Sequence, residues 1–241
     1  MISVVIPAYR EATEIEQSLE RLFHPQVSRG IPFEVIVSVA GEDDTLRVVE
    51  EFSRRRGLDN LRAVKSPKSR GLQLNRGAGE ARYSVLLFMH ADVSLPIGAL
   101  PALAETLDDE GVLGGSFLKR YHQRTPRFWG NIAVSYLRVR LFHVFFGNDC
   151  LFVRREVFEE LEGFAPIPLM EDVDFSRRLR QLRRRTQGGR LEVINLPVRA
   201  SARRYLKRGV LRQTWTILRT LTAYKLGRPP QELERRYYGK E

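Results

Sequence analysis

A short apolar run that ends in a carboxylate, Val85–Asp92, constrains the fold of this chain more than any other stretch. The run lies between Arg82 and Pro96, and its length favours a strand that is buried on both faces. Such a strand would place Asp92 at the carboxyl edge of a parallel sheet, where open α/β folds bind their ligands. Asp92 is therefore a candidate functional residue. The alternative is an Asp that only caps the turn after a strand.

The N-terminal part of the chain alternates between strand and helix patterns up to the end of that run. In order, the sequence predicts strand Ser3–Pro7, helix Glu14–Phe23, strand Phe33–Val39, helix Thr45–Arg56, strand Leu61–Val64, helix Gln73–Arg82 and strand Val85–Asp92. This alternation indicates right-handed βαβ crossovers and a parallel sheet. We therefore expect a Rossmann-like, nucleotide-binding half-domain.

The rest of the chain adds more helices than strands. The predicted helices are Pro96–Leu107, Arg127–Phe146, Glu156–Leu161, Met170–Arg185 and Leu206–Leu226, and the predicted strands are Val112–Leu118, Cys150–Val153 and Leu191–Leu196. The helix Arg127–Phe146 is unusually apolar, so it is expected either in the core or at a membrane surface. No repeat or low-complexity linker interrupts the chain. We expect one domain over residues 1–205 and a helical appendage over 206–241.

The charge balance indicates affinity for polyanions. Forty Lys and Arg against 29 Asp and Glu give a formal charge of +11, which favours nucleic acid, anionic lipid or nucleotide phosphates as partners. The single cysteine, Cys150, excludes an intramolecular disulfide framework and fits a reducing compartment. No signal peptide or membrane-spanning run is expected. The prediction is a cytoplasmic protein with possible peripheral contact at the inner face of the membrane.

Four polar clusters lie at predicted strand ends or helix starts. They are Pro7–Glu11, the basic loop Lys65–Gly71, His90–Asp92 and Glu171-Asp172. An Asp at a strand end can bind Mg²⁺ or Mn²⁺, which prefer oxygen ligands. Arg70 could bind phosphates, and Asp172 could accept a proton from an attacking hydroxyl. The alternative for Glu171-Asp172 is ordinary acidic charge at a helix N-terminus.

Four segments, in this order, resemble the motifs of family 2 glycosyltransferases, which have the GT-A fold. They are the opening segment Ser3–Glu11, the metal-binding strand Leu86–Asp92, the segment Gly147–Arg155 before the acceptor loop, and the "ED" motif and helix Leu169–Leu179. The resemblance covers about residues 1–205. It is strongest to a small bacterial branch with "HAD" and "PLMEDV" motifs. It implies an α/β fold with a Rossmann-like, mostly parallel central sheet flanked by helices.

The resemblance implies a metal-dependent inverting glycosyltransferase. Such an enzyme moves a sugar from a nucleotide-diphosphate sugar to an acceptor hydroxyl, and the acceptor would be a sugar, a lipid-linked molecule or a small molecule. Asp92 would bind the Mn²⁺ or Mg²⁺ on the diphosphate. Asp172 would be the general base, with Glu171 beside it. The residues implied to bind the donor are Pro7, Tyr9, Glu11, Ser38, Arg70 and Asp92.

Three departures from the family pattern affect these expectations. Ser38 stands where the family has a strand-end Asp that contacts the donor base, and Asp43 or Asp44 are candidates to replace it. His90 stands where many relatives have the first Asp of their metal motif, and a packing role is favoured over metal binding. Ser201–Tyr205 replaces the C-terminal "QxxRW" motif of processive synthases, so processive synthesis is not expected.

Two other functions compete with glycosyl transfer. A nucleotidyltransferase would need a glycine-rich phosphate loop after the first strand, and Ala8–Glu11 contains no glycine. A basic module without catalysis could bind nucleic acid or a membrane surface through Arg183–Arg185 and Arg199–Arg208. Charge runs of this kind are usually solvated faces, so nucleic acid is the less favoured partner.

Overall fold

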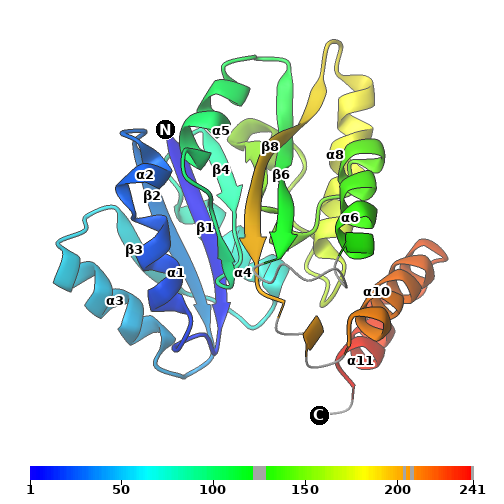
Figure 1. The fold of residues 1–241 in the computed structure, drawn as a ribbon, viewed down its shortest axis with the longest axis horizontal. Helices are drawn as coiled ribbons and strands as arrows, with labels where there is room; N and C mark the ends of the chain where they lie inside the picture. Colours follow the sequence, from blue (N-terminus) through cyan, green and yellow to red (C-terminus); the bar gives the residue numbers. More distant parts are fainter. Residues whose placement is uncertain (122–128, 203–204, 207–208, 240–241) are drawn as a thin grey trace.

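The computed structural model describes residues 1–121, 129–202, 205–206 and 209–239. Over these residues, one sheet of eight strands has the order β3-β2-β1-β4-β7-β6-β8-β5, with helices on both faces (Figure 1). The strands are β1 Ile2–Tyr9, β2 Phe33–Ala40, β3 Leu61–Lys65, β4 Val85–Phe88, β5 Val93–Ser94, β6 Val112–Tyr121, β7 Leu151–Arg154 and β8 Arg190–Ala200. The helices are α1 Ile15–Leu22, α2 Pro25–Ser28, α3 Thr45–Arg56, α4 Arg70–Glu80, α5 Ala99–Leu107, α6 Trp129–Phe142, the 3-10 turn η2 Gly147–Asp149, α7 Arg155–Glu160, α8 Glu171–Arg185, α10 Val210–Lys225 and α11 Pro230–Tyr238.

Most strand pairs are parallel. β3, β2, β1 and β4 all run in one direction, as the alternating pattern predicted. β7 runs antiparallel to both of its neighbours, β4 and β6, and β8 is again parallel to β6. The carboxyl ends of β1, β4, β6 and β8 therefore lie on one edge of the sheet, the lower one in Figure 1. This edge is called the carboxyl edge below, and it is where ligands bind in such folds.

The core has two layers, one on each face of the sheet. In β1, Val4 and Ile6 contact the layer built with α1, α3 and α5, whereas Val5 contacts the layer built with α4, α7 and α8. β4 divides in the same way, because successive side chains of a strand point to opposite faces. All residues of Val85–Phe88 are buried, so the predicted strand with two buried faces is confirmed over this range.

The predicted strand Val85–Asp92 is too long at its carboxyl end. β4 stops at Phe88, and Asp92 lies in a turn in which the Val93 N–H donates to the His90 carbonyl at 3.1 Å. The chain then pairs with β8 as the short strand β5. Asp92 therefore lies just beyond the carboxyl edge, in the connection between two strands.

The prediction that β1 ends at Pro7 is wrong, because the strand continues to Tyr9. The backbone groups of alternate residues in a strand point toward the same neighbouring strand. The backbone of Pro7 therefore points toward β4, as the carbonyl of Val5 does. That carbonyl accepts from the Met89 N–H at 3.0 Å, just after β4 has ended. Proline is tolerated in a strand where no partner needs its missing donor. The missing donor falls where β4 has already left the sheet.

The first turn of α4 contains Arg70, which the sequence placed in a loop before a helix at Gln73–Arg82. The helix begins three residues earlier than predicted and ends at Glu80. Ser69 precedes it with extended backbone, and serine is a common residue at this position. Arg70 is thus held by a helix and not by a loop.

Two elements in the second half differ from the prediction. β8 passes the predicted end at Leu196 and reaches Ala200, after a register shift in which Leu118 pairs with Pro197. The predicted helix Arg127–Phe146 corresponds to α6, which ends at Phe142. Residues 127 and 128 lie outside the described residues.

The C-terminal helices pack beside the start of α8. Leu233 of α11 and Leu221 of α10 contact the cluster formed by Leu169, Met170 and Val173. This agrees with a helical appendage, while its boundary as a separate unit stays a prediction. Residues 203–204, 207–208 and 240–241 lie outside the described residues. Across the described ranges, each helix falls short of the length and apolar character needed to cross a membrane.

Candidate active site

The starts of α4 and α8 meet at the carboxyl edge. They bring Arg70 next to Glu171 and Asp172, which are separated from it by about a hundred residues in sequence. Gly71 permits this approach, because a Cβ there would lie 2.7 Å from the Ala165 carbonyl oxygen, in the loop before α8. A larger side chain would force the helix and the loop apart.

Arg70 contacts both carboxylates. Its Nε donates to Oε1 of Glu171, and its Nη2 lies 3.5 Å from Oδ2 of Asp172. The Glu171 side chain is 1% exposed, so its charge would be costly to bury without this partner. The Asp172 side chain keeps 11% of its surface exposed. Asp172 is therefore the carboxylate that a bound molecule could reach.

The contacts among Arg70, Glu171 and Asp172 shift the pKa values of Arg70 and Glu171. Burial raises the pKa of Glu171; Arg70 opposes that shift and Asp172 adds to it. Burial opposes the charged form of Arg70, yet Glu171 and Asp172 together raise the pKa of its guanidinium above the usual range. Arg70 thus remains a cation shared by two acids, which is the arrangement expected at a site that handles protons and anions.

Asp172 is held in place by backbone N–H groups. Its Oδ2 accepts from the Gly147 N–H at 2.9 Å, and its Oδ1 accepts from the Val173 N–H at 2.8 Å. Gly147 also contacts the turn after β4, because a Cβ on Gly147 would overlap Nε2 of His90. The His90 ring thus packs against Gly147, which is the packing role that the sequence favoured. Gly147 connects the turn that carries Asp92 to the carboxylate of Asp172.

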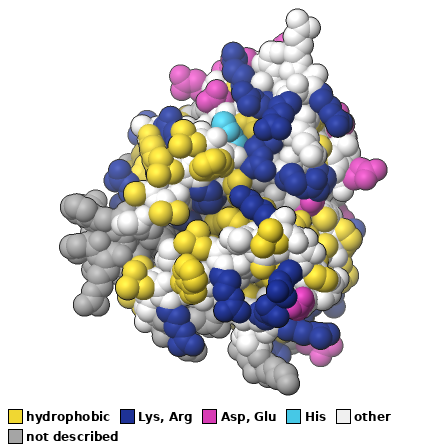
Figure 2. All heavy atoms as spheres, turned by 90° about the vertical axis from the view of Figure 1, so that its right-hand side faces the viewer, with side chains coloured by type: hydrophobic (Ala, Val, Ile, Leu, Met, Phe, Trp, Pro, Cys, Tyr) yellow, Lys and Arg dark blue, Asp and Glu magenta, His cyan; other side chains and the backbone are white. Residues whose placement is uncertain are grey.

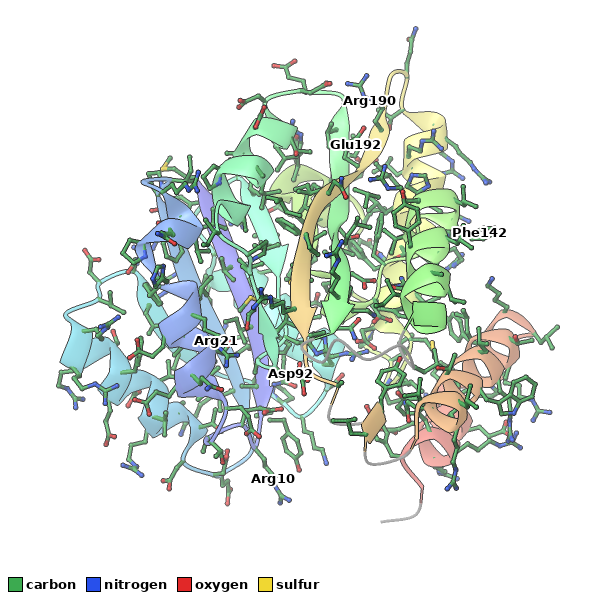
Figure 3. All side chains as sticks on the ribbon, in the orientation of Figure 1. Arg10, Arg21, Asp92, Phe142, Arg190 and Glu192 are labelled. Atoms are coloured by element: carbon green, nitrogen blue, oxygen red, sulfur yellow. The ribbon has the colours of Figure 1, made fainter. Side chains whose placement is uncertain are left out.

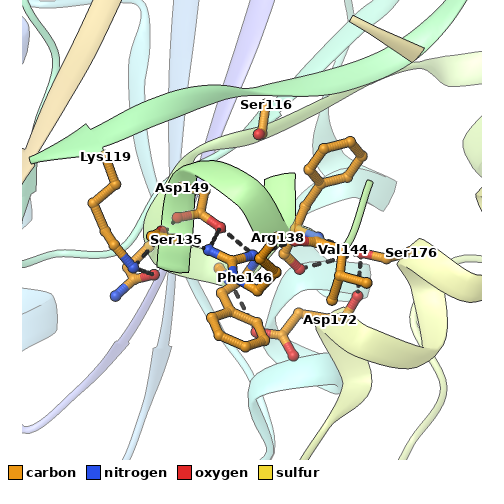
Figure 4. Close-up of polar contacts among 12 residues, drawn as sticks. Ser116, Lys119, Ser135, Arg138, Val144, Phe146, Asp149, Asp172 and Ser176 are labelled. Carbon is orange, nitrogen blue, oxygen red and sulfur yellow. Dashed lines mark hydrogen bonds and ion pairs between the residues drawn. The ribbon is translucent and has the colours of Figure 1, made fainter. Parts of the chain in front are cut away.

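A buried ionic network fixes η2, the turn that contains Gly147 (Figure 4). Asp149 is fully buried, and its Oδ2 accepts from Arg138 of α6 and from the Phe146 N–H, both at 2.7 Å. Lys119 of β6 lies 3.4 Å from Oδ1 of Asp149 and donates to Asn148 at 3.1 Å. The network ties together α6, β6 and η2.

The ionic network shifts the pKa values of its members in the direction expected for a buried pair. Burial alone would raise the pKa of Asp149, but Arg138 and Lys119 hold it below the usual range. Burial lowers the pKa of Lys119, and Asp149 opposes that shift. The carboxylate is therefore held ionised between two cations.

The predicted donor residues at the N-terminal strands lie along the same edge. Lys68 lies 4.5 Å above the Tyr9 ring, and the ring also packs against Gly41. The Glu11 N–H donates to Oγ1 of Thr45 at 3.0 Å. β1 and its following loop thus contact the segments after β2 and β3, as parallel strands with convergent ends should.

Asp43 and Asp44, the two acids predicted to replace a strand-end Asp, differ in their surroundings. Asp44 is exposed and pairs with Arg47 at 3.2 Å, which lowers the pKa of Asp44. Asp43 accepts from Oγ1 of Thr45 at 2.7 Å, and the same hydroxyl accepts from the Glu11 N–H. Asp43 is therefore the acid that belongs to the predicted donor edge.

Ser38 and Pro7 occupy paired positions in the register of β1 and β2. Ser38 is completely buried, and a Cβ on Gly77 of α4 would lie 3.7 Å from its Cβ. Its side chain thus points under α4, away from the surface, and its predicted contact with the donor stays a prediction. Pro7 is partly exposed.

Asp92 is half-buried at the carboxyl edge, and Figure 3 shows it near the ends of β6 and β8, with Arg10 farther out. The Ser201 N–H donates to the Asp92 carbonyl at 3.2 Å, which fixes the turn to the end of β8. Within the described residues, no group of three or more His, Cys, Asp and Glu side chains could hold a metal ion. Asp92 is thus the acidic side chain that this turn offers to a cation.

Sequence reasoning missed two features of the site. Gln73 is buried and donates to the carbonyls of Ala8 at 2.7 Å and Ser38 at 2.9 Å, so it fixes the ends of β1 and β2 together. The sequence signal for this role was a glutamine on the apolar face of a predicted helix, because a buried amide needs hydrogen-bond partners. The support of Asp172 by Gly147 was also missed, although an Arg inside the apolar stretch of α6 signalled that a buried acid was needed nearby.

The family of this chain follows from a match over most of its length. Residues 3–162 match the family model described as Glycosyl transferase family 2. The chain belongs to this family. The match confirms the family that the four motifs indicated, and it spans the four parallel strands and the turn that carries Asp92.

A curated relative agrees with this assignment. A dolichyl-phosphate beta-glucosyltransferase from Drosophila melanogaster is 30% identical over an alignment of 178 residues. The match covers 68% of this chain and 53% of that protein. The chain therefore spans about half the length of this relative.

Solved structures of other proteins share the fold. The mannosyltransferase PcManGT from Pyrobaculum calidifontis, in complex with GDP-Man and Mn²⁺, superposes with a TM-score of 0.67 at 23% sequence identity. The match covers 98% of this chain and 68% of the PcManGT chain. TarS from S. aureus, in complex with UDP-GlcNAc, superposes with a TM-score of 0.59 at 20% sequence identity. That match covers 83% of this chain and 58% of the TarS chain. These similarities confirm the predicted GT-A fold.

Proposed function

We propose that this protein is a metal-dependent inverting glycosyltransferase that uses a nucleotide-diphosphate sugar. The observation that carries the proposal is the position of Asp172. This carboxylate, whose side chain keeps 11% of its surface exposed, lies at the carboxyl edge, with one oxygen fixed by the Gly147 N–H and with Arg70 beside it. Helix N-terminal charge alone would not explain why Arg70, from another helix, is directed at the same pair of acids.

The carboxyl edge offers a surface for a nucleotide. Tyr9 and Glu11 follow β1, Asp43 lies next to the Glu11 backbone, and Lys68 covers the Tyr9 ring. Lys68 and Arg70 would bind phosphate oxygens through charge-assisted hydrogen bonds. The complexes of PcManGT with GDP-Man and of TarS with UDP-GlcNAc support a nucleotide sugar as the donor class.

Asp92 fits the requirements of a divalent cation bound together with its substrate. Mg²⁺ usually keeps one or two carboxylate ligands and takes further oxygens from substrate phosphates. The half-buried carboxylate of Asp92, in a turn fixed at both ends, is a donor of this kind. A bound Mn²⁺ or Mg²⁺ would neutralise charge that develops on the diphosphate leaving group.

The chemistry assigned to the chain is a single displacement. Asp172 accepts the proton of the acceptor hydroxyl while that oxygen forms a bond to the anomeric carbon. The bond from this carbon to the diphosphate oxygen breaks, and the nucleoside diphosphate leaves with the bonding electron pair. Because the attack comes from the opposite side, the configuration inverts. Glu171 holds the guanidinium of Arg70 in place, and the positive charge of Arg70 partly balances the negative charge of Asp172.

We infer a lipid-linked acceptor ahead of a sugar or a small molecule. The support is the curated relative, whose name states a dolichyl-phosphate acceptor. A buried, free Cys150 fits a reducing compartment, so we place the reaction at the cytoplasmic side of the membrane.

Two substitutions test the mechanism. With a panel of UDP- and GDP-sugars, Mn²⁺ and a lipid-phosphate acceptor, Asp172→Asn should lower turnover by about 10²–10⁴-fold, because the general base is lost. Asp92→Asn should instead increase the Mn²⁺ concentration needed for half-maximal rate. The exposed Asp108→Asn serves as the matched control and should change neither value.

The anomeric configuration of the product provides an independent test. It can be read by NMR from the coupling of the anomeric proton. Retention of the donor's configuration, or full turnover by Asp172→Asn, would rule out this mechanism.

A further inference from the structure

The helix α10 leaves large apolar side chains exposed. Leu211 is 86% exposed and Trp215 is 67% exposed, and both lie on one face with Leu218. The residues that this helix buries are polar: Gln213, which donates to the Tyr237 hydroxyl at 3.1 Å, and Thr220. A surface helix normally directs its apolar face to the core. In α10, Ile217 and Leu221 contact the core clusters, but Leu211, Trp215 and Leu218 form a second apolar face that points outward.

The helix α6 also leaves apolar side chains exposed. Val134, Leu137 and Leu141 follow each other at helical spacing on an exposed face. Its buried side includes Ser135 and Arg138, whose guanidinium binds Asp149 and the Ser135 hydroxyl. The buried side of α6 thus serves the network below the site and also packs Val139 into the core, while the exposed side keeps apolar side chains uncovered.

Both apolar faces lie on one side of the molecule. Figure 2 looks onto this side and shows hydrophobic side chains gathered in groups, with Lys and Arg between and around them. We name this surface the interfacial face. It consists of the exposed side chains Val134, Tyr136, Leu137, Leu141 and Phe142 of α6 and Leu211, Trp215 and Leu218 of α10.

The charged residues of α6 and α10 themselves are all basic. Neither α6 nor α10 contains an acidic residue, and α10 carries the exposed Arg212 and Arg219. Arg180 of α8 donates to the Phe142 carbonyl at 2.6 Å, so the basic side of α8 adjoins the end of α6. Burial lowers the pKa of Arg180, and the positive charge of the nearby Arg184 lowers it further.

We propose that the interfacial face binds the surface of an anionic lipid bilayer. Helices that lie in a membrane interface combine Leu, Phe and Trp on one face with flanking Lys and Arg, and they bind anionic lipids through both. Large exposed apolar patches on soluble proteins mark interaction sites. An acidic protein would complement only the arginines, and a second copy of this chain, with a formal charge of +11, would repel them. An anionic bilayer complements both the arginines and the apolar side chains.

The interfacial face is continuous with the proposed active site. From α6 the chain passes directly into Gly147, which donates to Asp172, and Arg138 on the inner side of α6 supports the same turn. α10 packs beside the start of α8 through Leu221 and Tyr224. A bilayer bound here would lie beside the catalytic base. Delivery of a lipid-linked acceptor rests on the proposed function, whereas lipid binding does not.

Vesicle sedimentation of the full chain tests the proposal. The protein should sediment with vesicles of equal parts phosphatidylglycerol and phosphatidylcholine and much less with phosphatidylcholine alone. Raising the salt should weaken binding, because the arginine contribution is screened. Leu211→Ser with Trp215→Ser should weaken binding by about tenfold or more, since each buried large apolar side chain contributes roughly 1.5–3 kcal/mol and 1.4 kcal/mol is tenfold.

The matched control is Ile97→Ser, which removes an exposed apolar side chain that is 53% accessible and lies before α5. It should leave vesicle binding unchanged. In a Trp129→Phe background, Trp215 fluorescence should shift to the blue on anionic vesicles. Hydrolysis of a soluble donor should remain unchanged in Leu211→Ser with Trp215→Ser, which separates this proposal from the catalytic one.

Three results would overturn the proposal. The first is equal binding by Leu211→Ser with Trp215→Ser and by the unmodified chain. The second is the absence of sedimentation with anionic vesicles. The third is a concentration-dependent dimer that Trp215→Ser abolishes while vesicle binding persists, because a second copy would then be the occupant of this face.

Discussion

Arg70 is a single cation that serves two acids. It contacts Glu171, whose side chain is 1% exposed, and Asp172, whose side chain is 11% exposed. Removal of a cation from such a pair leaves a buried charge without compensation, whereas removal of both partners does not. The contribution of Arg70 should therefore depend strongly on which acid is present.

A double-substitution cycle should reveal this dependence. Arg70→Met should lower the free energy of unfolding by about 3 kcal/mol, and Arg70→Met with Glu171→Gln should lower it by clearly less. Urea unfolding measures both values. The matched control is Arg76→Met, because Arg76 pairs with Glu80 on an exposed face at 2.8 Å. Additive effects of Arg70→Met and Glu171→Gln would contradict the buried pair.

Gly147 is the second residue on which the site depends. Its Cα faces the His90 ring, and its N–H holds Asp172. Gly147→Ala should displace that N–H and lower turnover by about tenfold or more, as a small misplacement of a catalytic group does. His90→Ala should restore much of the rate in the double variant, because it vacates the space that the new Cβ needs.

The control for Gly147→Ala is Gly79→Ala in α4, where a Cβ meets nothing within 4 Å. That substitution should raise stability by roughly 0.5–1 kcal/mol, because alanine is the better helix residue, and should leave turnover unchanged. Failure of His90→Ala to rescue Gly147→Ala would show that the contact with His90 is not what requires a glycine.

At the scale of elements, the buried acid Asp149 joins α6, β6 and η2. Arg138 and Lys119 lower its pKa in spite of burial, so the folded state favours the carboxylate. A group with a lowered pKa in the folded state stabilises the fold above its ordinary pKa. That stabilisation is lost as the pH falls through the lowered value.

The stability difference between the unmodified chain and Asp149→Asn should therefore depend on pH. At about pH 7 the variant leaves two cations buried and should unfold at a clearly lower temperature. Below about pH 4, the ordinary range of an Asp, the difference should shrink, because the unfolded chain takes up a proton at Asp149 that the folded state resists until lower pH. Melting curves over this range provide the measurement. A constant difference down to about pH 3 would show that the charge of Asp149 is not what matters.

Local pattern predicted the elements well and their ends less well. The helix Thr45–Arg56 was predicted with its observed bounds, and β2 within one residue, because amphipathic spacing and bounding turn residues are local signals. β4 was predicted four residues too long, since His90 and Asp92 continue a strand pattern while the partner strand decides where pairing stops. The direction of β7 could not be predicted, because it depends on partners far away in sequence.

The sequence could predict which residue types the candidate site contains, but not which residues contact one another there. Asp92, Glu171 and Asp172 carry chemistry that a motif can show. The shared Arg70, by contrast, follows from a helix that starts three residues earlier than its pattern indicates. The role of Gly147 depends on a backbone N–H, which no side-chain pattern records.

For the molecule as a whole, the described residues form two core layers on one sheet, and the C-terminal helices join through a third cluster. That third cluster includes Met170 and Val173 at the start of α8, as well as Leu233 of α11. The appendage is therefore packed against the part of the fold that positions Asp172. We expect it to unfold together with the sheet.

Two probes in one denaturation experiment test this cooperativity. In a Trp129→Phe variant, fluorescence reports on Trp215 in α10, and far-UV circular dichroism reports on the whole chain. The two transitions should coincide, as they do in a two-state unit. A fluorescence transition at clearly lower urea concentration would show that residues 206–241 form a separate unit, as the predicted domain boundary allows.

The distance of 101 positions between Arg70 and Glu171 has a consequence for synthesis of the protein. At a translation rate of about 5–20 residues per second, Arg70 leaves the ribosome roughly 5–20 seconds before its carboxylate partner. The parallel strands β1 to β4 are complete in that interval, so a nascent chain has the carboxyl edge of these strands before it has Glu171 and Asp172. The ribosome thus produces the basic part of the candidate site first, and the two acids join it only when α8 emerges and docks.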